Sequence, residues 1–248
     1  MYKQRKGKKM IVINKKRISI IVICLVLGIF AYSYEGTKIN LDQEIQETTS
    51  TPVSGKVIVL DAGHGVPDEG AQSSRGTTEA ETNLKIALKV QNLLEQSGCT
   101  VILTRSDENA IYDLDKNTLR EKKISDIRNR VKIGNNSSAD IFVSIHLNKI
   151  PQQQYWGWQC FYNSKNEKSI NLAKKIQSNL NSSIQKENKR VAMKLDTVYI
   201  MKHVEIPISI VECGFLSNPE EEQQLLNDEY QNKLAWGIFN GIIEYFNE

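Results

Sequence analysis

Residues 57–65 have the sequence Val-Ile-Val-Leu-Asp-Ala-Gly-His-Gly, in which a β-branched apolar run ends in a carboxylate and a histidine between two glycines. Nearly every position of the run is apolar, which predicts a strand over Val57–Asp61 that is covered on both faces. The glycines allow a sharp turn that presents the imidazole of His64 at the carboxyl end of the strand. The stretch therefore predicts a buried parallel strand with a reactive side chain directly after it.

Further β-branched runs alternate along the chain with segments of helical spacing. Strands are expected at Thr100–Thr104, Ile141–Ile145 and Ile208–Glu212, with extra strands at Val198–Met201 and, at an edge of the sheet, Gly157–Tyr162. Helices are expected at Glu81–Gln96, Lys122–Asn135, Asn166–Ser183 and Glu229–Phe246. This alternation predicts an α/β fold, a single domain with a mainly parallel central sheet flanked by helices.

The first 55 residues differ in composition from the rest. Residues 1–17 are predicted to be a basic cytoplasmic segment, residues 18–34 an apolar transmembrane anchor or signal peptide, residues 35–55 a linker, and residues 56–248 the folded domain. Positive charge before an apolar run predicts an N-terminus inside the cell and an exported body. Tyr32 and Tyr34 suit a membrane interface, which favours an uncleaved anchor, although Ala31-Tyr32-Ser33 could also be a cleavage site.

The net charge of +3 arises from the N-terminal segment. Eight of the 32 basic residues precede the first acid, Glu35, so the remaining 24 face 29 acidic residues and leave about −5. The body of the protein therefore has no basic excess with which to neutralise phosphates, and the composition argues against a nucleic-acid partner.

Two of the three histidines occupy equivalent places, since His146 also follows an apolar run, Ile141–Ile145. The carboxyl ends of parallel strands meet at one edge of a sheet, so His64 and His146 are expected in one site. Glu212 closes another apolar run, and Glu79 opens the helix after the first histidine's loop. Two imidazoles and a carboxylate with one open position are typical of catalytic zinc, and a further carboxylate can act as a base.

Several other residues compete for roles in this site. His203 is the obvious alternative third ligand, but it lies in a polar stretch that predicts a surface loop, and Glu81 lies next to Glu79 in sequence. Asp61 could orient a ligand imidazole or cap the turn. The exported cysteines, Cys99, Cys160 and Cys213, have no CxxC spacing and are expected to be small buried hydrophobic residues.

Four motifs occur in order: Asp61-Ala62-Gly63-His64-Gly65, Glu79 before Asn83-Leu84, Ser144-Ile145-His146-Leu147-Asn148, and Val211-Glu212-Cys213-Gly214-Phe215-Leu216-Ser217-Asn218. Together they resemble the zinc-dependent N-acetylmuramoyl-L-alanine amidases of the type-3 amidase family, over about Lys56 to Phe246. The resemblance implies that His64, Glu79 and His146 bind Zn²⁺ and that Glu212 is the catalytic carboxylate. It alone selects Glu79 over Glu81. Leu147 departs from the family's usual small residue, which should alter packing more than chemistry.

Within the family the chain looks most like the germination-specific amidases of the spore cortex. The segments that carry this similarity are Leu119–Arg130 and Asp196–Tyr199, together with the N-terminal apolar run and the lack of wall-binding repeats. The resemblance implies a peptidoglycan substrate, cleavage between N-acetylmuramic acid and L-alanine before muramic-δ-lactam forms, a membrane-attached or secreted location outside the cytoplasm, and an activating lipoprotein partner.

Two other functions compete with this one. A zinc carboxypeptidase-like peptidase of the cell wall would use the same four residues, because the chemistry suits any amide. A non-catalytic wall-binding scaffold could keep the fold without turnover. In the amidase mechanism Glu212 would take a proton from water and later protonate the leaving L-alanine nitrogen, and Asn148 could donate a hydrogen bond to the oxyanion.

Overall fold

The computed structural model describes residues 23–35 and 51–248, in two separate units that divide after Thr49. Residues 23–35 are helical. Within the described residues, no helix is both long and apolar enough to cross a membrane. The predicted basic segment, the first part of the apolar run and most of the linker lie outside the described residues. Val53, inside the predicted linker, is fully buried in the core of the second unit.

A six-stranded mixed sheet of order β2-β1-β3-β6-β4-β5 forms the centre of the second unit. The strands are β1 (Val57–Ala62), β2 (Thr100–Leu103), β3 (Ile141–Asn148), β4 (Gln159–Tyr162), β5 (Met193–Lys194) and β6 (Ile208–Phe215). β2, β1, β3 and β6 run parallel to one another, β4 is antiparallel to β6, and β5 is parallel to β4. The strand predicted at Gly157–Tyr162 exists as β4, but its edge is covered by β5.

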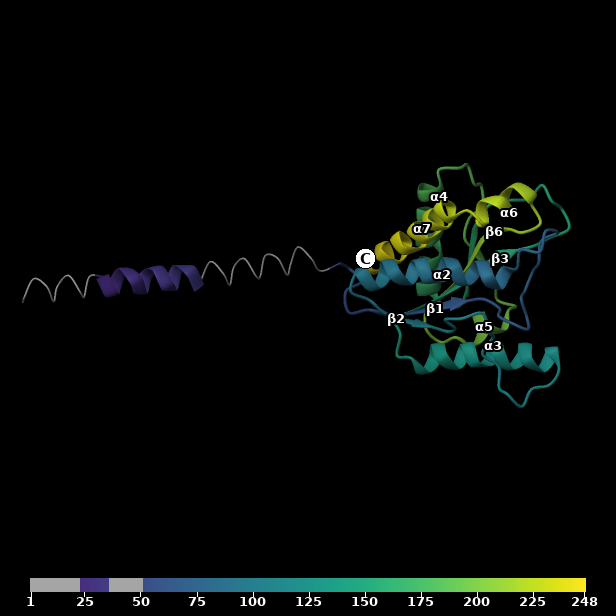
Figure 1. Ribbon diagram of the computed structural model, residues 1–248, viewed down its shortest axis with the longest axis horizontal. Helices are drawn as coiled ribbons and strands as arrows, with labels where there is room; N and C mark the ends of the chain where they lie inside the picture. The colour runs from purple at the N-terminus through teal and green to yellow at the C-terminus, as the bar shows by residue number, and fades with distance from the viewer. Residues whose placement is uncertain (1–22, 36–50) are drawn as a thin grey trace, which may run out of the picture. The chain divides into compact units, whose positions relative to one another are not determined.

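Six helices accompany the sheet: α2 (Glu79–Gln96), α3 (Leu119–Asn136), α4 (Glu167–Ile184), α5 (Tyr199–His203), α6 (Pro219–Leu225) and α7 (Asp228–Phe246). Figure 1 shows α2, α4 and α7 over one face of the sheet and α3 with α5 over the other. Local sequence defines where these helices begin. Thr78 accepts the N–H of Glu81 at the start of α2, and Thr118 and Glu121 form a capping box on α3.

The strand predicted at Val198–Met201 is wrong, because the segment instead begins the short helix α5. Ile200, Met201 and Val204 are buried against α3 and the sheet, and their spacing of one and four residues places them on one face of a helix. The β-branched and aromatic residues of this segment favour a strand locally, but its burial pattern follows the helical period.

Alternation along β6 separates the carboxylate from the thiol. Glu212 projects toward the α3 face, whereas Cys213 is fully buried in the cluster under α2, α4 and α7. Cys99 and Cys160 are buried in the same cluster, which confirms that the three cysteines are small buried residues. β3 and β6 run three residues farther than predicted, so His146 and Glu212 lie within strands and not at their last residues.

Candidate active site

The turn after β1 brings His64 against His146. His64 adopts a left-handed backbone conformation with φ of 62°, and the two imidazole ring centres are 5.2 Å apart. A Cβ on Gly63 would lie 2.2 Å from the His146 ring, so only glycine permits this approach. A Cβ on Gly70 would lie 2.6 Å from Glu79 Oε2. Two glycines thus provide the space in which three polar side chains meet.

Glu79 joins the two histidines from the first turn of α2. Its Oε1 lies 2.9 Å from His146 Nδ1 and accepts the backbone N–H of Leu147, while its Oε2 lies 3.4 Å from His64 Nε2 and accepts the N–H of Ala71. Glu79 is 4% exposed. Burial works to raise its pKa, but hydrogen bonds and charge from the two histidines hold the pKa of this carboxyl well below its usual range.

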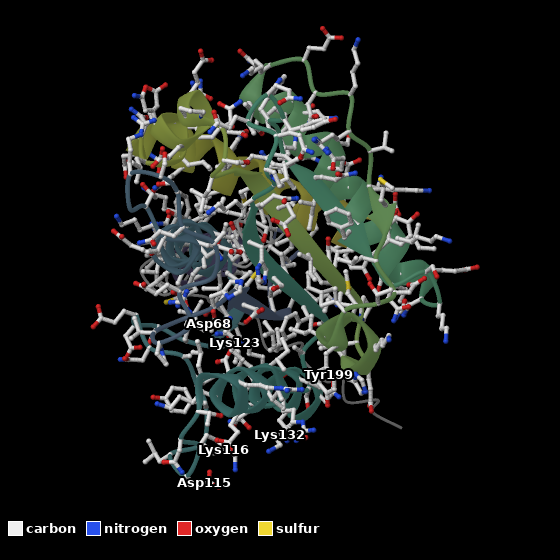
Figure 2. All side chains as sticks on the ribbon, turned by 90° about the vertical axis from the view of Figure 1, so that its right-hand side faces the viewer. Asp68, Asp115, Lys116, Lys123, Lys132 and Tyr199 are labelled. Carbon is white, nitrogen blue, oxygen red and sulfur yellow. The ribbon has the colours of Figure 1, made fainter. Side chains whose placement is uncertain are left out.

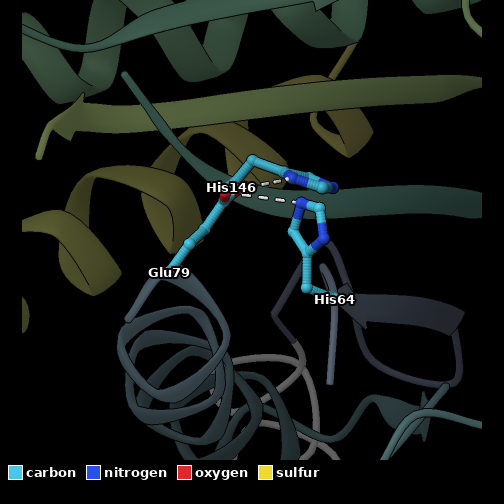
Figure 3. Close-up of side chains that lie close together, drawn as sticks. All are labelled: His64, Glu79 and His146. Atoms are coloured by element: carbon cyan, nitrogen blue, oxygen red, sulfur yellow. Dashed lines mark hydrogen bonds and ion pairs between the residues drawn. The ribbon is translucent and has the colours of Figure 1, made fainter. Parts of the chain in front are cut away.

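His64, Glu79 and His146 form a cluster that could hold a metal ion, because one ligand atom from each lies within 4.8 Å of the others (Figure 3). Two nitrogens and one carboxylate oxygen form a donor set that suits catalytic zinc, which takes three protein ligands and keeps a fourth position for water or substrate. Glu81 is not part of the cluster, since it is exposed and pairs with Lys85 at 2.7 Å. His203 is not part of the cluster either. Its Nδ1 lies 2.8 Å from the carbonyl oxygen of Tyr199, and its ring stacks on that tyrosine.

Asp68 supports the other side of His64. Its Oδ2 lies 3.4 Å from His64 Nδ1, and its Oδ1 lies 2.9 Å from Nζ of Lys123 on α3. Figure 2 shows Asp68 and Lys123 side by side at the end of the molecule that faces the viewer. Although burial works against the charged imidazole, Asp68 and Glu79 raise the pKa of His64 to about 9. A carboxylate on the second ring nitrogen fixes the orientation of an imidazole ligand.

Glu212 lies next to the cluster, directly opposite His146 in the β3–β6 pairing. Its Oε2 is buried and has no hydrogen-bond partner among the described residues. Burial raises the pKa of Glu212 to about 7, with Glu79 adding to the shift and His146 opposing it. An unpaired carboxyl group with a pKa near neutrality is well suited to transfer protons.

A buried ionic network of Asp61 and Arg130 supports the turn that carries His64. Asp61 Oδ1 accepts hydrogen bonds from Nη1 of Arg130 at 2.6 Å and from the hydroxyl of Thr104 at 2.7 Å. Its Oδ2 accepts a hydrogen bond from the hydroxyl of Ser144 at 2.5 Å. Arg130 also donates to the carbonyl oxygen of His64 at 2.6 Å. Asp61 therefore acts on the site through Arg130, and neither contacts an imidazole ligand nor caps the turn with its carboxylate.

Asp68, Arg130 and Arg105 support the cluster although no sequence motif predicts a role for them. Arg105 is buried and donates to the carbonyl oxygens of Ala62, Gly63 and Ala80, which fixes the backbone around the cluster. The only available signals were the spacing of four residues between His64 and Asp68 and between Asp126 and Arg130. Neither spacing indicates which face of the sheet these side chains reach.

The fold and the motifs match known proteins over almost the whole folded unit. The model of the family described as N-acetylmuramoyl-L-alanine amidase matches residues 58–244. The germination-specific N-acetylmuramoyl-L-alanine amidase of Bacillus subtilis is 38% identical over 199 residues, which cover 80% of this chain and 83% of that protein. The N-acetylmuramoyl-L-alanine amidase LytC of the same organism is 29% identical and is covered over only 38% of its length.

Solved structures give the same answer. The CwlD amidase of Clostridioides difficile, in complex with the GerS lipoprotein, is 42% identical with a TM-score of 0.76, over 78% of this chain and 99% of that one. An N-acetylmuramoyl-L-alanine amidase of Clostridium difficile 630 is 30% identical with a TM-score of 0.69, over 79% and 98%. This chain therefore belongs to the N-acetylmuramoyl-L-alanine amidase family and is similar to its germination-specific members.

Proposed function

We propose that this protein hydrolyses the amide bond between N-acetylmuramic acid and L-alanine in peptidoglycan, with zinc held by His64, Glu79 and His146. The observation that carries the proposal is the convergence of these three donors beside Glu212, whose buried Oε2 lacks a partner. Members of this family are generally zinc-dependent, and the donor set matches that preference. A zinc ion bound there would supply positive charge that lowers the pKa of water and polarises the substrate carbonyl.

The protein's own residues then move the proton. Glu212 takes a proton from the attacking water and delivers it to the L-alanine nitrogen as the amide bond breaks, so one carboxyl group serves both steps. Its raised pKa lets it exist in either protonation state near neutral pH. Glu79 and Asp68 keep the imidazoles in fixed orientations through the contacts at 2.9 and 3.4 Å. Asn148, two residues beyond His146 on β3, is proposed as a hydrogen-bond donor to the oxyanion.

The biological setting follows from the relatives. Similarity to the germination-specific amidase supports a role in spore-cortex maturation, in which peptide stems are removed before muramic-δ-lactam forms. We further propose that the N-terminal segment exports or anchors the protein, so that residues 56–248 act outside the cytoplasm. The structure of the related CwlD amidase with a lipoprotein supports a partner of that class here.

One experiment tests the reaction. Muropeptides of defined structure are treated with the purified protein in the presence of Zn²⁺, and the products are identified by mass spectrometry. Free muramic acid carboxyl groups together with new L-alanine amino termini are the expected result. Loss of C-terminal amino acids from the stem would indicate a carboxypeptidase-like enzyme instead, and binding of peptidoglycan without any release would indicate a scaffold.

A further inference from the structure

A row of three side chains crosses the sheet at the level of the proposed site. His146 of β3 pairs with Glu212 of β6, and Glu212 pairs on its other side with Gln159 of β4. Directly paired residues on neighbouring strands project from the same face of a sheet, and strands lie about 4.8 Å apart. The row therefore extends the site beyond Glu212, on the side opposite to β1 and His64.

Arg190 lies at the far end of this row. Its Nη1 donates to Gln159 Oε1 at 3.1 Å, its Nε donates to the carbonyl oxygen of Trp156 at 3.2 Å, and its guanidinium is 4.7 Å from the centre of the Phe215 ring. The backbone N–H of Arg190 donates to the side chain of Asn188 at 3.1 Å. These contacts hold the half-buried guanidinium in one position before any substrate arrives.

The contacts of Arg190 are all neutral. In the part of the chain that the structure describes, Arg75 pairs with Glu222, and Arg130 pairs with Asp61 and Asp126, whereas Arg190 forms no ion pair. The nearby buried carboxylate of Glu221 uses both oxygens to accept backbone N–H groups at 2.8 Å. The charge of Arg190 opposes the effect of burial on the pKa of Glu221, but the guanidinium makes no direct ion pair with that carboxylate. A partly desolvated cation without a direct ion pair favours an anion supplied from outside.

We propose that Arg190 binds a carboxylate of the peptide stem and makes the site selective for acidic stems, an inference that rests on the proposed function. The only carboxyl group of N-acetylmuramic acid is consumed in the scissile amide, so the glycan side of the substrate has no free carboxylate. The peptide side has one wherever a residue after L-alanine keeps its carboxyl group free. A guanidinium has five N–H donors, of which the contacts above use two, and it can bind a carboxylate through two parallel hydrogen bonds.

The test compares two muropeptides that are identical except that the stem carboxylates are free in one and amidated in the other. In the full chain, Arg190→Gln should lower kcat/KM for the acidic muropeptide about 10- to 100-fold, mainly through KM, because a charge-assisted contact is lost. The value for the amidated muropeptide should change by less than about threefold. Arg190→Lys, which keeps the charge without the planar fork, should give an intermediate loss on the acidic muropeptide.

Lys189→Gln is the matched control, because it removes a positive charge from the residue next to Arg190. The side chain of Lys189 is 88% exposed, and its Nζ lies 3.6 Å from a carboxylate oxygen of the exposed Glu187. This substitution should leave both rates unchanged. Equal losses of Arg190→Gln on the two muropeptides, or equal rates of the unmodified protein on them, would overturn the proposal. If Arg190→Gln unfolds, Arg190→Lys and the preference of the unmodified protein decide the matter.

A failure of the proposed function has a different signature, since the unmodified protein would then release stems with a new L-alanine amino terminus from neither muropeptide. In that case the same two muropeptides are titrated into the protein and its Arg190 variants by calorimetry. Tighter binding of the acidic form that disappears in Arg190→Gln supports the carboxylate site without any turnover, and equal Kd values for the two forms contradict it.

Discussion

Asp61 and Glu212 are both carboxylates on the α3 face of the sheet, and they differ in how their oxygens are satisfied. Both oxygens of Asp61 accept hydrogen bonds, from Arg130, Thr104 and Ser144, and although burial works to raise its pKa, Arg130 and these hydroxyls hold it below its usual range. Glu212 has a buried oxygen without a partner and a raised pKa. The satisfied carboxylate stabilises the fold, while the unsatisfied one remains available for chemistry.

The largest expected effect is at the metal cluster beside Glu212. His64→Ala or His146→Ala should remove nearly all bound zinc and all activity, because a site with three protein ligands loses affinity with any imidazole. Zinc content is measured by metal analysis after dialysis. His203→Ala, which removes an imidazole whose ring nitrogen lies 2.8 Å from the carbonyl oxygen of Tyr199 in the same short helix, should keep full zinc. Stoichiometric zinc in both ligand variants would show that the metal binds elsewhere.

Glu212→Gln should lower the rate of amide hydrolysis by about 10² to 10⁴, the usual cost of losing a general acid–base. Zinc content should remain, since Glu212 is not one of the three clustered donors. The free energy of unfolding of Glu212→Gln should not fall below that of the unmodified protein. A carboxyl group whose pKa rises from about 4.3 in the unfolded chain to about 7 in the folded protein destabilises the folded state as pH increases.

Thermal melting of the metal-free proteins at pH 8 checks this second part of the comparison. Glu212→Gln should melt at the same temperature as the unmodified protein or above it. A lower melting temperature would mean that the Glu212 carboxylate stabilises the fold, loss of zinc in the variant would make it a metal ligand, and near-normal turnover would remove it from the mechanism.

Substitution in the hydrogen-bonded network around Asp61 should, in contrast, lower the stability of the fold. Arg130→Met should destabilise the protein by about 3–5 kcal/mol, because removing one partner of a buried ion pair leaves the other charge uncompensated. The free energy of unfolding is measured by urea titration of metal-free protein. Arg128→Met on the same helix changes an exposed residue and serves as the control. A loss below about 1 kcal/mol for Arg130→Met would mean that the network contributes little.

Asp68→Asn should weaken zinc binding by about 10- to 100-fold, as expected when a carboxylate that orients a ligand imidazole is replaced. The fold should survive, because Asp68 lies in a surface turn and not in the core. Competition with a chromophoric chelator measures the affinity. Lys123→Gln, which removes the cation paired with Asp68 at 2.9 Å, should have a smaller effect in the same direction. Unchanged affinity in Asp68→Asn would show that Glu79 alone orients the site.

The smallest expected effect is the pH dependence that Asp61 adds to stability. Its folded-state pKa is lowered, so its contribution is complete above the unfolded value of about 3.9 and disappears as pH falls below that value. Between pH 6 and pH 3 the unmodified protein should therefore lose more stability than Asp61→Asn does. Parallel curves for the two proteins would contradict the pairing of Asp61 with Arg130.

Several parts of the fold could be predicted because their signals are local. The apolar run before His64 and the helical spacing after Glu79 predict elements whose existence the structure confirms. Other parts depended on distant segments. β3 continues past His146 because it pairs with β6 with a register shift, and residues 199–203 become helical because α3 offers them an apolar surface. Hydrophobic spacing does not encode either of these partners.

The sequence by itself determined the chemical types of the site: two imidazoles and two carboxylates that follow or open regular elements. The family resemblance favoured Glu79 over Glu81, and the tertiary structure shows that Glu79 is the one that reaches the histidines. Only the tertiary structure decided that Asp68 supports His64 and that Arg190 lies at the end of the row without a direct ion pair. The physical reason is that residue type and period are properties of a short stretch of chain. Burial, register and the pairing of charges depend on which segments come together when the sheet and its helices pack.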